Sequence, residues 1–359
     1  MKNTTSQILK RTTFYSCLLF ISLLFINCNN DDDTQPPTYE FGEKFKDIED
    51  LPVVVDEDLA TPDPDAGKVA ESEKTLAIIP DILGASTEAE VSADTKSSLN
   101  TIKAYTASQP IAVVEAAESL GEAGIDAILD QSVALNATLS DLQASLDGVS
   151  DEVAALLPNI QLSTDFERSN ISAQTKAGII VDLNDADIFS QAQTGPCHEA
   201  ARDAYNDIIA DLTGQRDANL AIVDANYTRR QSEADARLET RIAVQAILLE
   251  DNKTAVKTTI LSLLDAAEYA EIFLSMEIAS EIRQLTLYYA VYARTALDVW
   301  NTAVLEILES LNLEEKAAAE EHRNNLVAQE TAFFETTTSE AQAILNGILN
   351  NCHNQGSGN

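Results

Sequence analysis

The chain of 359 residues carries 59 acidic and 23 basic residues, and its formal net charge is −36. A surface of this sign repels phosphate groups, so we expect no nucleic acid among its partners and no attraction to anionic lipid headgroups. The charge favours solubility but does not specify a fold.

The N-terminus has the three parts of a secretory signal. Lys2, Lys10 and Arg11 supply positive charge with no acidic residue among them, an apolar run follows over residues 14–26, and Cys28 ends it before polar sequence begins. This order is typical of an export signal. The apolar run is too short to cross a hydrocarbon core of about 30 Å as a permanent helix. We therefore expect residues 1–27 to be removed as a signal peptide.

The cleavage point Phe25-Ile26-Asn27-Cys28 resembles the lipobox of bacterial lipoproteins, in the loose form of the Bacteroidota. Phe25 and Asn27 depart from the leucine and the small residue that are commoner there. The resemblance covers only the start of the chain and implies a class of precursor, not a fold. It implies that Cys28 carries acyl chains such as palmitate, that the protein is an outer-membrane lipoprotein, and that the acids after Cys28 resemble a surface-export tag. An ordinary signal peptide, an uncleaved anchor or a plain acidic linker are the alternatives.

Residues 28–65 are predicted to form a disordered acidic tether. Residues 29–65 include 13 acidic residues, two basic residues and five prolines, a composition that cannot bury enough apolar surface to fold. The valines at 53–55 are the one short patch that could dock or pair as a strand. After cleavage, 20 basic residues face 59 acidic residues, a net charge of −39.

Cysteine usage predicts one disulfide. Cleavage before Cys28 and its lipidation leave two thiols, Cys197 and Cys352. Two remaining thiols in an exported chain most simply pair with each other. Each is followed by a histidine, His198 or His353, so a zinc site is an alternative, although adjacent ligands do not match the usual spacing. Two free thiols are the third interpretation.

Residues 66–157 are rich in Ala, Ser and Leu at helical spacing and predict a bundle of short helices. The helices are expected near 66–79, 87–106, 110–120, 124–146 and 149–157, with proline and glycine between them. Residues 158–196 lose this periodicity and are interpreted as an irregular boundary loop, in which 177–183 is a candidate strand without a partner.

Residues 197–352 predict long helices, because the chain has no proline between Pro196 and Cys352 and glycine only at 214 and 347. Polar clusters at 249–253, 310–312 and 335–339 are interpreted as breaks that divide this region into four helices. Residues 353–359 are expected to be a disordered tail.

The helix expected at 253–310 has the clearest pattern, because apolar residues recur every three or four positions from Val256 to Leu311. We expect it to be the buried central helix. The helix at 198–250 has a thinner stripe, interrupted at Arg216 and Gln231, and is expected to be partly solvated. An even number of helical passes would return Cys352 to the level of Cys197.

These patterns predict an all-α protein, in which a small N-terminal helical bundle precedes a long antiparallel helical hairpin or bundle that resembles a coiled coil.

Patterns for catalysis or metal binding are scarce. The only histidines are His198, His322 and His353, and no hydrolase, metalloprotease or nucleotide-binding motif is present. We therefore assign no catalytic residue, no metal ligand and no cofactor. Acidic groups at 182–187 and 63–67 could attract calcium, but neither has the order of an EF-hand loop.

Two further groups of side chains are given structural interpretations. The aromatic residues at helical spacing are expected to be core rather than the lining of a ligand pocket; they are Tyr288, Tyr289, Tyr292 and Trp300. The doublet Arg229-Arg230 is expected to be solvated or paired with Glu233.

The function that these features favour is a cell-surface helical lipoprotein with a binding, adhesion or scaffold role. Its expected partners are the membrane, through lipid on Cys28, and a protein at the cell surface. The alternatives are a membrane-active protein that exposes its apolar central helix and a hydrolase that uses a pair of carboxylates.

Overall fold

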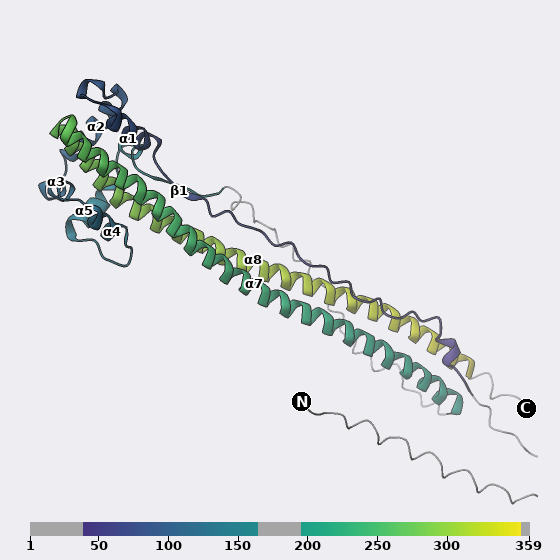
Figure 1. Cartoon of the computed structure of the whole chain (residues 1–359). Helices are drawn as coiled ribbons and strands as arrows, with labels where there is room; N and C mark the ends of the chain where they lie inside the picture. Colours follow the sequence, from purple (N-terminus) through teal and green to yellow (C-terminus); the bar gives the residue numbers. More distant parts are fainter. Residues whose placement is uncertain (1–38, 164–194, 353–359) are drawn as a thin grey trace, which may run out of the picture.

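Two very long helices form the body of the molecule. The computed structural model describes residues 39–163 and 195–352. Helix α7 (Pro196–Phe273, 78 residues) and helix α8 (Met276–Cys352, 77 residues) run antiparallel as a hairpin (Figure 1). At 1.5 Å per residue each helix is about 115 Å long. The all-α prediction with a long antiparallel hairpin is confirmed.

The predicted number of helical passes is wrong, because the hairpin has two passes and not four. The expected breaks at 249–253, 310–312 and 335–339 all lie inside continuous helix. Their polar side chains do not cap helix ends. Thr336 and Thr338 donate to the carbonyls of Ala332 and Phe334, one turn back in the same helix, both at 2.8 Å. These three clusters contain no proline or glycine, so the helix continues through each of them.

The real turn is at Leu274 and Ser275, inside the predicted central helix. Ser275 marks the start of α8, because its hydroxyl accepts from the backbone N–H of Ile278 at 3.3 Å. The apolar stripe continues through the turn, since both arms face one common core. Periodicity therefore could not reveal the turn.

Six short helices surround the end of the hairpin that carries this turn (Figure 1). Three of them start at a side chain that accepts from a backbone N–H three residues on, namely Ser72, Ser92 and Asn136. The predicted helix at 124–146 is two helices, divided before Asn136. The short helices are α1 (Glu73–Gly84), α2 (Ala93–Thr106), α3 (Ile111–Glu118), α4 (Glu122–Leu129), α5 (Ala137–Leu146) and α6 (Asp151–Ala154).

We call this end of the molecule the head. Its short helices contact α7 and α8 more than they contact one another, and one hydrophobic core joins them to the hairpin. Trp300 is fully buried in this core, and its indole N–H donates to the carbonyl of Ala66 at 2.9 Å. The predicted bundle at 66–157 is thus not a separate core, because its buried side chains belong to the same hydrophobic cluster as those of α7 and α8.

A small two-stranded sheet closes the head. Strand β1 (Lys68–Ala70) pairs antiparallel with β2 (Asn159–Gln161), with Val69 opposite Ile160. Gly67 precedes β1 with a φ of 66°, and a Cβ there would lie 1.9 Å from the carbonyl oxygen of Gln161. Two 3₁₀ turns complete the described elements, η1 (Gly42–Lys44) and η2 (Glu88–Glu90). The candidate strand at 177–183 lies outside the described residues.

Replacing Gly67 with alanine is expected to destabilise the head by at least about 1–2 kcal/mol, the cost of a left-handed backbone for a residue with a Cβ. The close approach to Gln161 adds to this loss. Gly148→Ala is the matched control, because nothing lies within 4 Å of a Cβ at that position. Urea unfolding of both variants provides the measurement, and equal stabilities would contradict the assignment.

The opposite end of the hairpin, which we call the base, is closed by a disulfide. Cys197 near the start of α7 and Cys352 at the end of α8 are bonded, with their Cα atoms 5.9 Å apart. The predicted pairing is present in the structure, although two helical passes bring the cysteines together rather than four. A second hydrophobic cluster lies beside the bridge and includes Phe45, Ala201 and Leu345. Residues 353–359 lie outside the described part.

No helix among the described residues is long and apolar enough to cross a membrane.

Candidate functional site: the Asp56 cluster

An extended segment runs along the hairpin from the base to the head (Figure 1). We call residues 39–65 the strap. Its prolines at 52, 62 and 64 disfavour regular helix, and apart from the 3₁₀ turn η1 it has no regular secondary structure. The prediction of a disordered tether is wrong for this stretch. Residues 28–38 lie outside the described part.

The strap is fixed by contacts along its whole length. Phe45 is fully buried at the base, and Leu51 is buried next to α7. The backbone N–H of Leu51 donates to Gln215 at 2.7 Å, and Asn219 donates to the carbonyl of Pro52 at 3.1 Å. Further along, Arg241 donates to the carbonyl of Pro62 at 2.6 Å. The helices thus satisfy backbone groups that the strap cannot satisfy itself.

Charge complementarity explains why so acidic a segment docks. The strap has ten acidic residues and two basic ones. The part of α7 beside it carries an unusual density of arginine for this protein, at Arg216, Arg229, Arg230, Arg237 and Arg241. Composition alone suggests that the strap repels itself and stays unfolded. The arginines on α7 remove that repulsion once the segment lies along the helix.

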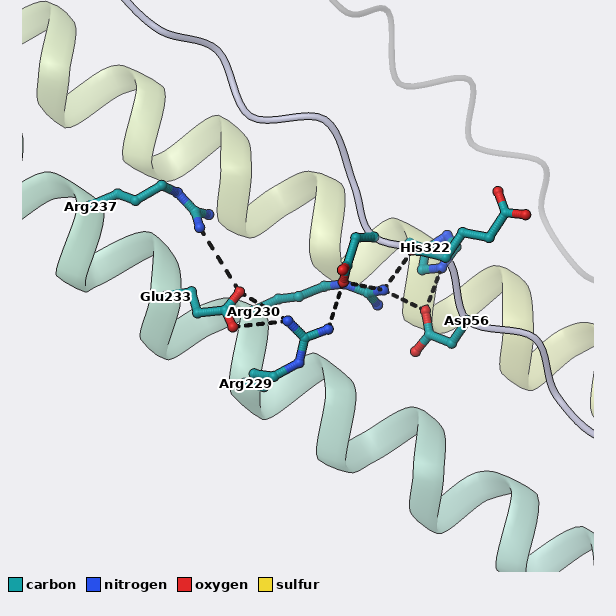
Figure 2. Close-up of polar contacts among 8 residues, drawn as sticks. Asp56, Arg229, Arg230, Glu233, Arg237 and His322 are labelled. Carbon is teal, nitrogen blue, oxygen red and sulfur yellow. Dashed lines mark hydrogen bonds and ion pairs between the residues drawn. The ribbon is translucent and has the colours of Figure 1, made fainter.

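Asp56, Arg230 and His322 form the most buried charged group of the strap, which we call the Asp56 cluster (Figure 2). Arg230 on α7 donates to the Asp56 carboxylate at 2.5 Å and to the carbonyl of Glu57 at 2.7 Å. His322 on α8 lies with its Nε2 2.8 Å from the same carboxylate oxygen. The Asp56 side chain is 2% exposed and that of Arg230 is 7% exposed. One carboxylate therefore joins the strap to both long helices.

The electrostatics favour an ionised Asp56. Burial alone would raise the pKa of this carboxyl group, but the hydrogen bonds from Arg230 and His322 hold the pKa below its ordinary value. Removing either partner would leave the other charge buried and uncompensated, which is the costly situation for a buried ion pair.

More exposed ion pairs flank the cluster (Figure 2). Arg229 binds Asp58 at 2.7 Å and Glu233 at 2.8 Å, so the expected pairing with Glu233 holds for Arg229 but not for Arg230. Glu315 on α8 is not exposed: its side chain is buried and pairs with Arg237 and Arg241 of α7, at 2.9 Å each. The pairs of Arg229 are exposed, so solvent screens them and they contribute little to stability. The Asp56 cluster is the most buried ion pair of the strap.

Acid is expected to weaken this contact. Because the pKa of Asp56 in the folded protein lies below its unfolded value, the stabilisation is fully present above the unfolded pKa and is lost as the pH falls through the folded pKa. The stability difference between the natural protein and Asp56→Asn should therefore be constant near neutral pH and shrink in acid. Urea unfolding of both proteins from about pH 7 to pH 2 provides the measurement. A difference that stays constant down to the acid limit would contradict the assignment.

The chemistry of the cluster is that of attachment. Arg230 donates hydrogen bonds to a carboxylate and to a backbone carbonyl, and His322 faces the same carboxylate oxygen. Two helices and the strap supply one group each, so the cluster fixes their relative position along the rod. Its geometry gives a firm contact in the middle of a long hairpin whose ends are held by the disulfide and by the head.

The structure brings together few of the residues singled out from the sequence. Cys197 and Cys352 are bonded, His198 lies at the base beside that bridge, and His322 lies in the Asp56 cluster. Cys28, His353 and the acidic group at 182–187 fall outside the described residues. Within the described residues, 39–163 and 195–352, no group of three or more His, Cys, Asp or Glu is placed to hold a metal ion.

Three of the four aromatic residues predicted to be core are fully buried, and the fourth, Tyr292, is partly buried against the same core. Tyr288, Tyr289 and Trp300 are fully buried, and the hydroxyl of Tyr288 lies 2.7 Å from that of Thr106. Burial raises the pKa of Tyr288 to about 12. In the strap, Asp65 accepts from the backbone N–H of Gly67 at 3.0 Å, which is a local turn contact.

Sequence reasoning missed Asp56 and the burial of Arg230. A signal for Arg230 was present, since it lies seven residues after Val223 and four before Ala234, on the inward stripe of α7. A buried charged residue in that position requires an opposite charge, which Asp56 of the strap supplies. Comparison of the chain with family models, curated proteins and solved structures gives no match.

Proposed function

We propose that the protein is a surface-exposed outer-membrane lipoprotein, a rigid anchored rod that carries a helical head away from the membrane for binding, adhesion or scaffolding. The observation that carries the proposal is the placement of the two ends. The strap begins at the base, beside the disulfide, whereas the head lies at the other end of the hairpin (Figure 1).

The distances support this arrangement. The 11 residues from Cys28 to residue 38 can span at most roughly 40 Å when fully extended. A lipid on Cys28 would therefore hold the base near the bilayer. The hairpin then places its tip, which the head surrounds, about 115 Å further away, a length set by the helical rise.

The rod is also built to stay straight. Its helices contain no interior proline, the disulfide closes the base, and the strap contacts both helices through the Asp56 cluster. The helices pack against each other along the hairpin. The net negative charge favours solubility and disfavours collapse of the rod onto an anionic bilayer.

The anchor is tested with Cys28→Ala. We expect the protein to lose its acyl chains and its membrane association, because a processed lipoprotein cysteine is the proposed attachment. Mass spectrometry of the natural protein and membrane fractionation of both proteins provide the readout. Cys17→Ala is the matched control and should change neither the acylation nor the membrane association.

Exposure of the head is tested separately, by adding protease to intact cells. We expect cleavage within the head of the natural protein and not of a periplasmic marker. Membrane association that persists in Cys28→Ala, or a head that is protected in intact cells, would overturn the proposal.

A further inference from the structure

The tip of the hairpin exposes three large apolar side chains. Ile272 is 73% exposed, Phe273 is 56% exposed and Met276 is 63% exposed. We call these three residues the tip patch. They flank the turn at Leu274 and Ser275, at the end of the rod farthest from the disulfide.

The turn itself does not require apolar residues. Short turns are dominated by glycine, proline, asparagine, aspartate and serine, and here only Ser275 is of that kind. Exposed clusters of large apolar side chains reduce solubility and commonly mark an interaction site in soluble proteins. The tip patch lies at the point of the molecule that a partner would meet first.

Acidic residues surround the tip patch. Four exposed ones lie on or beside the last turns of the hairpin, Glu118, Glu268, Glu271 and Glu277, and a fifth, Glu281, is buried beneath them. Two basic residues lie among them, and both are paired with acids. Lys103 pairs with Glu277 and, at 3.5 Å, with Glu281. Arg283 pairs with Glu271 and, at 3.1 Å, with Glu118.

The same ion pairs hold the tip in one geometry. Lys103 belongs to α2 and Glu118 is the last residue of α3, so the two short helices are joined to the hairpin next to the turn. The rings of Tyr269 and Phe273 also contact each other, with centroids 4.7 Å apart. A surface fixed before binding loses little conformational entropy when a partner docks.

We propose that the tip patch docks into an apolar pocket bordered by lysine and arginine on another protein. This inference rests on the proposed function, which places the tip outward. The acidic surroundings favour a basic rim on the partner. They disfavour insertion into a bilayer with anionic headgroups, and they disfavour a second copy of this chain, whose own tip carries the same charge.

The test is photo-crosslinking of the full lipidated protein in its own cells. A benzoylphenylalanine replaces Ile272, and Leu313, which is 67% exposed on α8 away from the head, is the control position. We expect an adduct from position 272 that is absent from position 313. Peptide mapping should place the attached residue in an apolar pocket of the partner that is bordered by Lys or Arg.

Two variants test the chemistry of the contact. Phe273→Glu should reduce the adduct at least about tenfold, because removing a central apolar anchor commonly costs more than one factor of ten in affinity. Glu268→Lys should reduce it as well, and the loss should grow at low salt. The matched control Leu313→Glu should leave the yield unchanged.

Every other outcome overturns the inference. These outcomes are no adduct at position 272, an adduct to phospholipid, an adduct to a second copy of the chain, or a partner site without a basic border. Protease treatment of intact cells separates this test from that of the proposed function. An exposed head without an adduct refutes only the inference, and a protected head with a mapped adduct refutes only the surface location.

Discussion

Replacing Asp56 with alanine is expected to destabilise the protein by about 3–5 kcal/mol, the usual cost of leaving a buried partner charge uncompensated. Arg230 is almost fully buried and loses the carboxylate that neutralises it. The first consequence should be release of the strap, since Asp56 is its contact with both long helices. Urea unfolding gives the loss of stability, and limited proteolysis should show new cleavage within residues 39–65.

A double variant shows whether the loss of stability comes from the uncompensated buried charge or from the loss of the ion pair itself. Asp56→Leu combined with Arg230→Met replaces the ion pair with apolar side chains, and such replacements are commonly neutral or stabilising. We expect this double variant to recover most of the stability that Asp56→Ala loses. Asp58→Ala is the control and should lose far less stability, because Asp58 is 79% exposed, pairs mainly with the exposed Arg229 and lies 4.0 Å from Arg230. If Asp58→Ala lost as much stability as Asp56→Ala, the conclusion that the buried cluster fixes the strap would be wrong.

Removing the disulfide is expected to lower the free energy of unfolding by about 5 kcal/mol, the chain-entropy value for a loop of this length. The bridge joins residues 155 apart and closes the base, where only a small hydrophobic cluster otherwise holds α7, α8 and the strap together. Cys352→Ser should therefore lower the thermal midpoint and allow both helices to fray from the base upward.

The three possible cysteine variants provide an internal control. Cys197→Ser, Cys352→Ser and the double change remove the same bond, so they should lose the same stability. Peptide mapping without reductant should find one linked pair in the natural protein. Two thiols that react with an alkylating agent in the folded, exported protein would contradict the bridge.

The hairpin could be predicted from the sequence because the features that produce it extend over many residues. The absence of proline and the long apolar stripe each require long helices, and the two thiols require that the ends meet. The turn could not be located in this way. Leu274 interrupts neither the composition nor the periodicity, and the polar clusters that resembled helix ends form hydrogen bonds within a continuous helix.

The strap could not be predicted because its order depends on a distant partner. Taken alone, residues 39–65 are acidic and proline-rich, and that composition favours disorder. The hydrogen bonds that join them to the helices reach at least 164 residues further along the chain, for example from Leu51 to Gln215. Only the position of Arg230 on the inward stripe of α7 indicated that a buried charge required an opposite charge.

Whether the hairpin carries the head away from the membrane can be measured as the height of the head above the bilayer. The lipidated protein would be reconstituted into liposomes and imaged by electron cryo-tomography, with a label on the exposed side chain of Ile111 in the head. We expect a layer of label about 100 Å or more from the bilayer, a distance set by the helical rise. A layer lying on the bilayer surface would contradict this expectation.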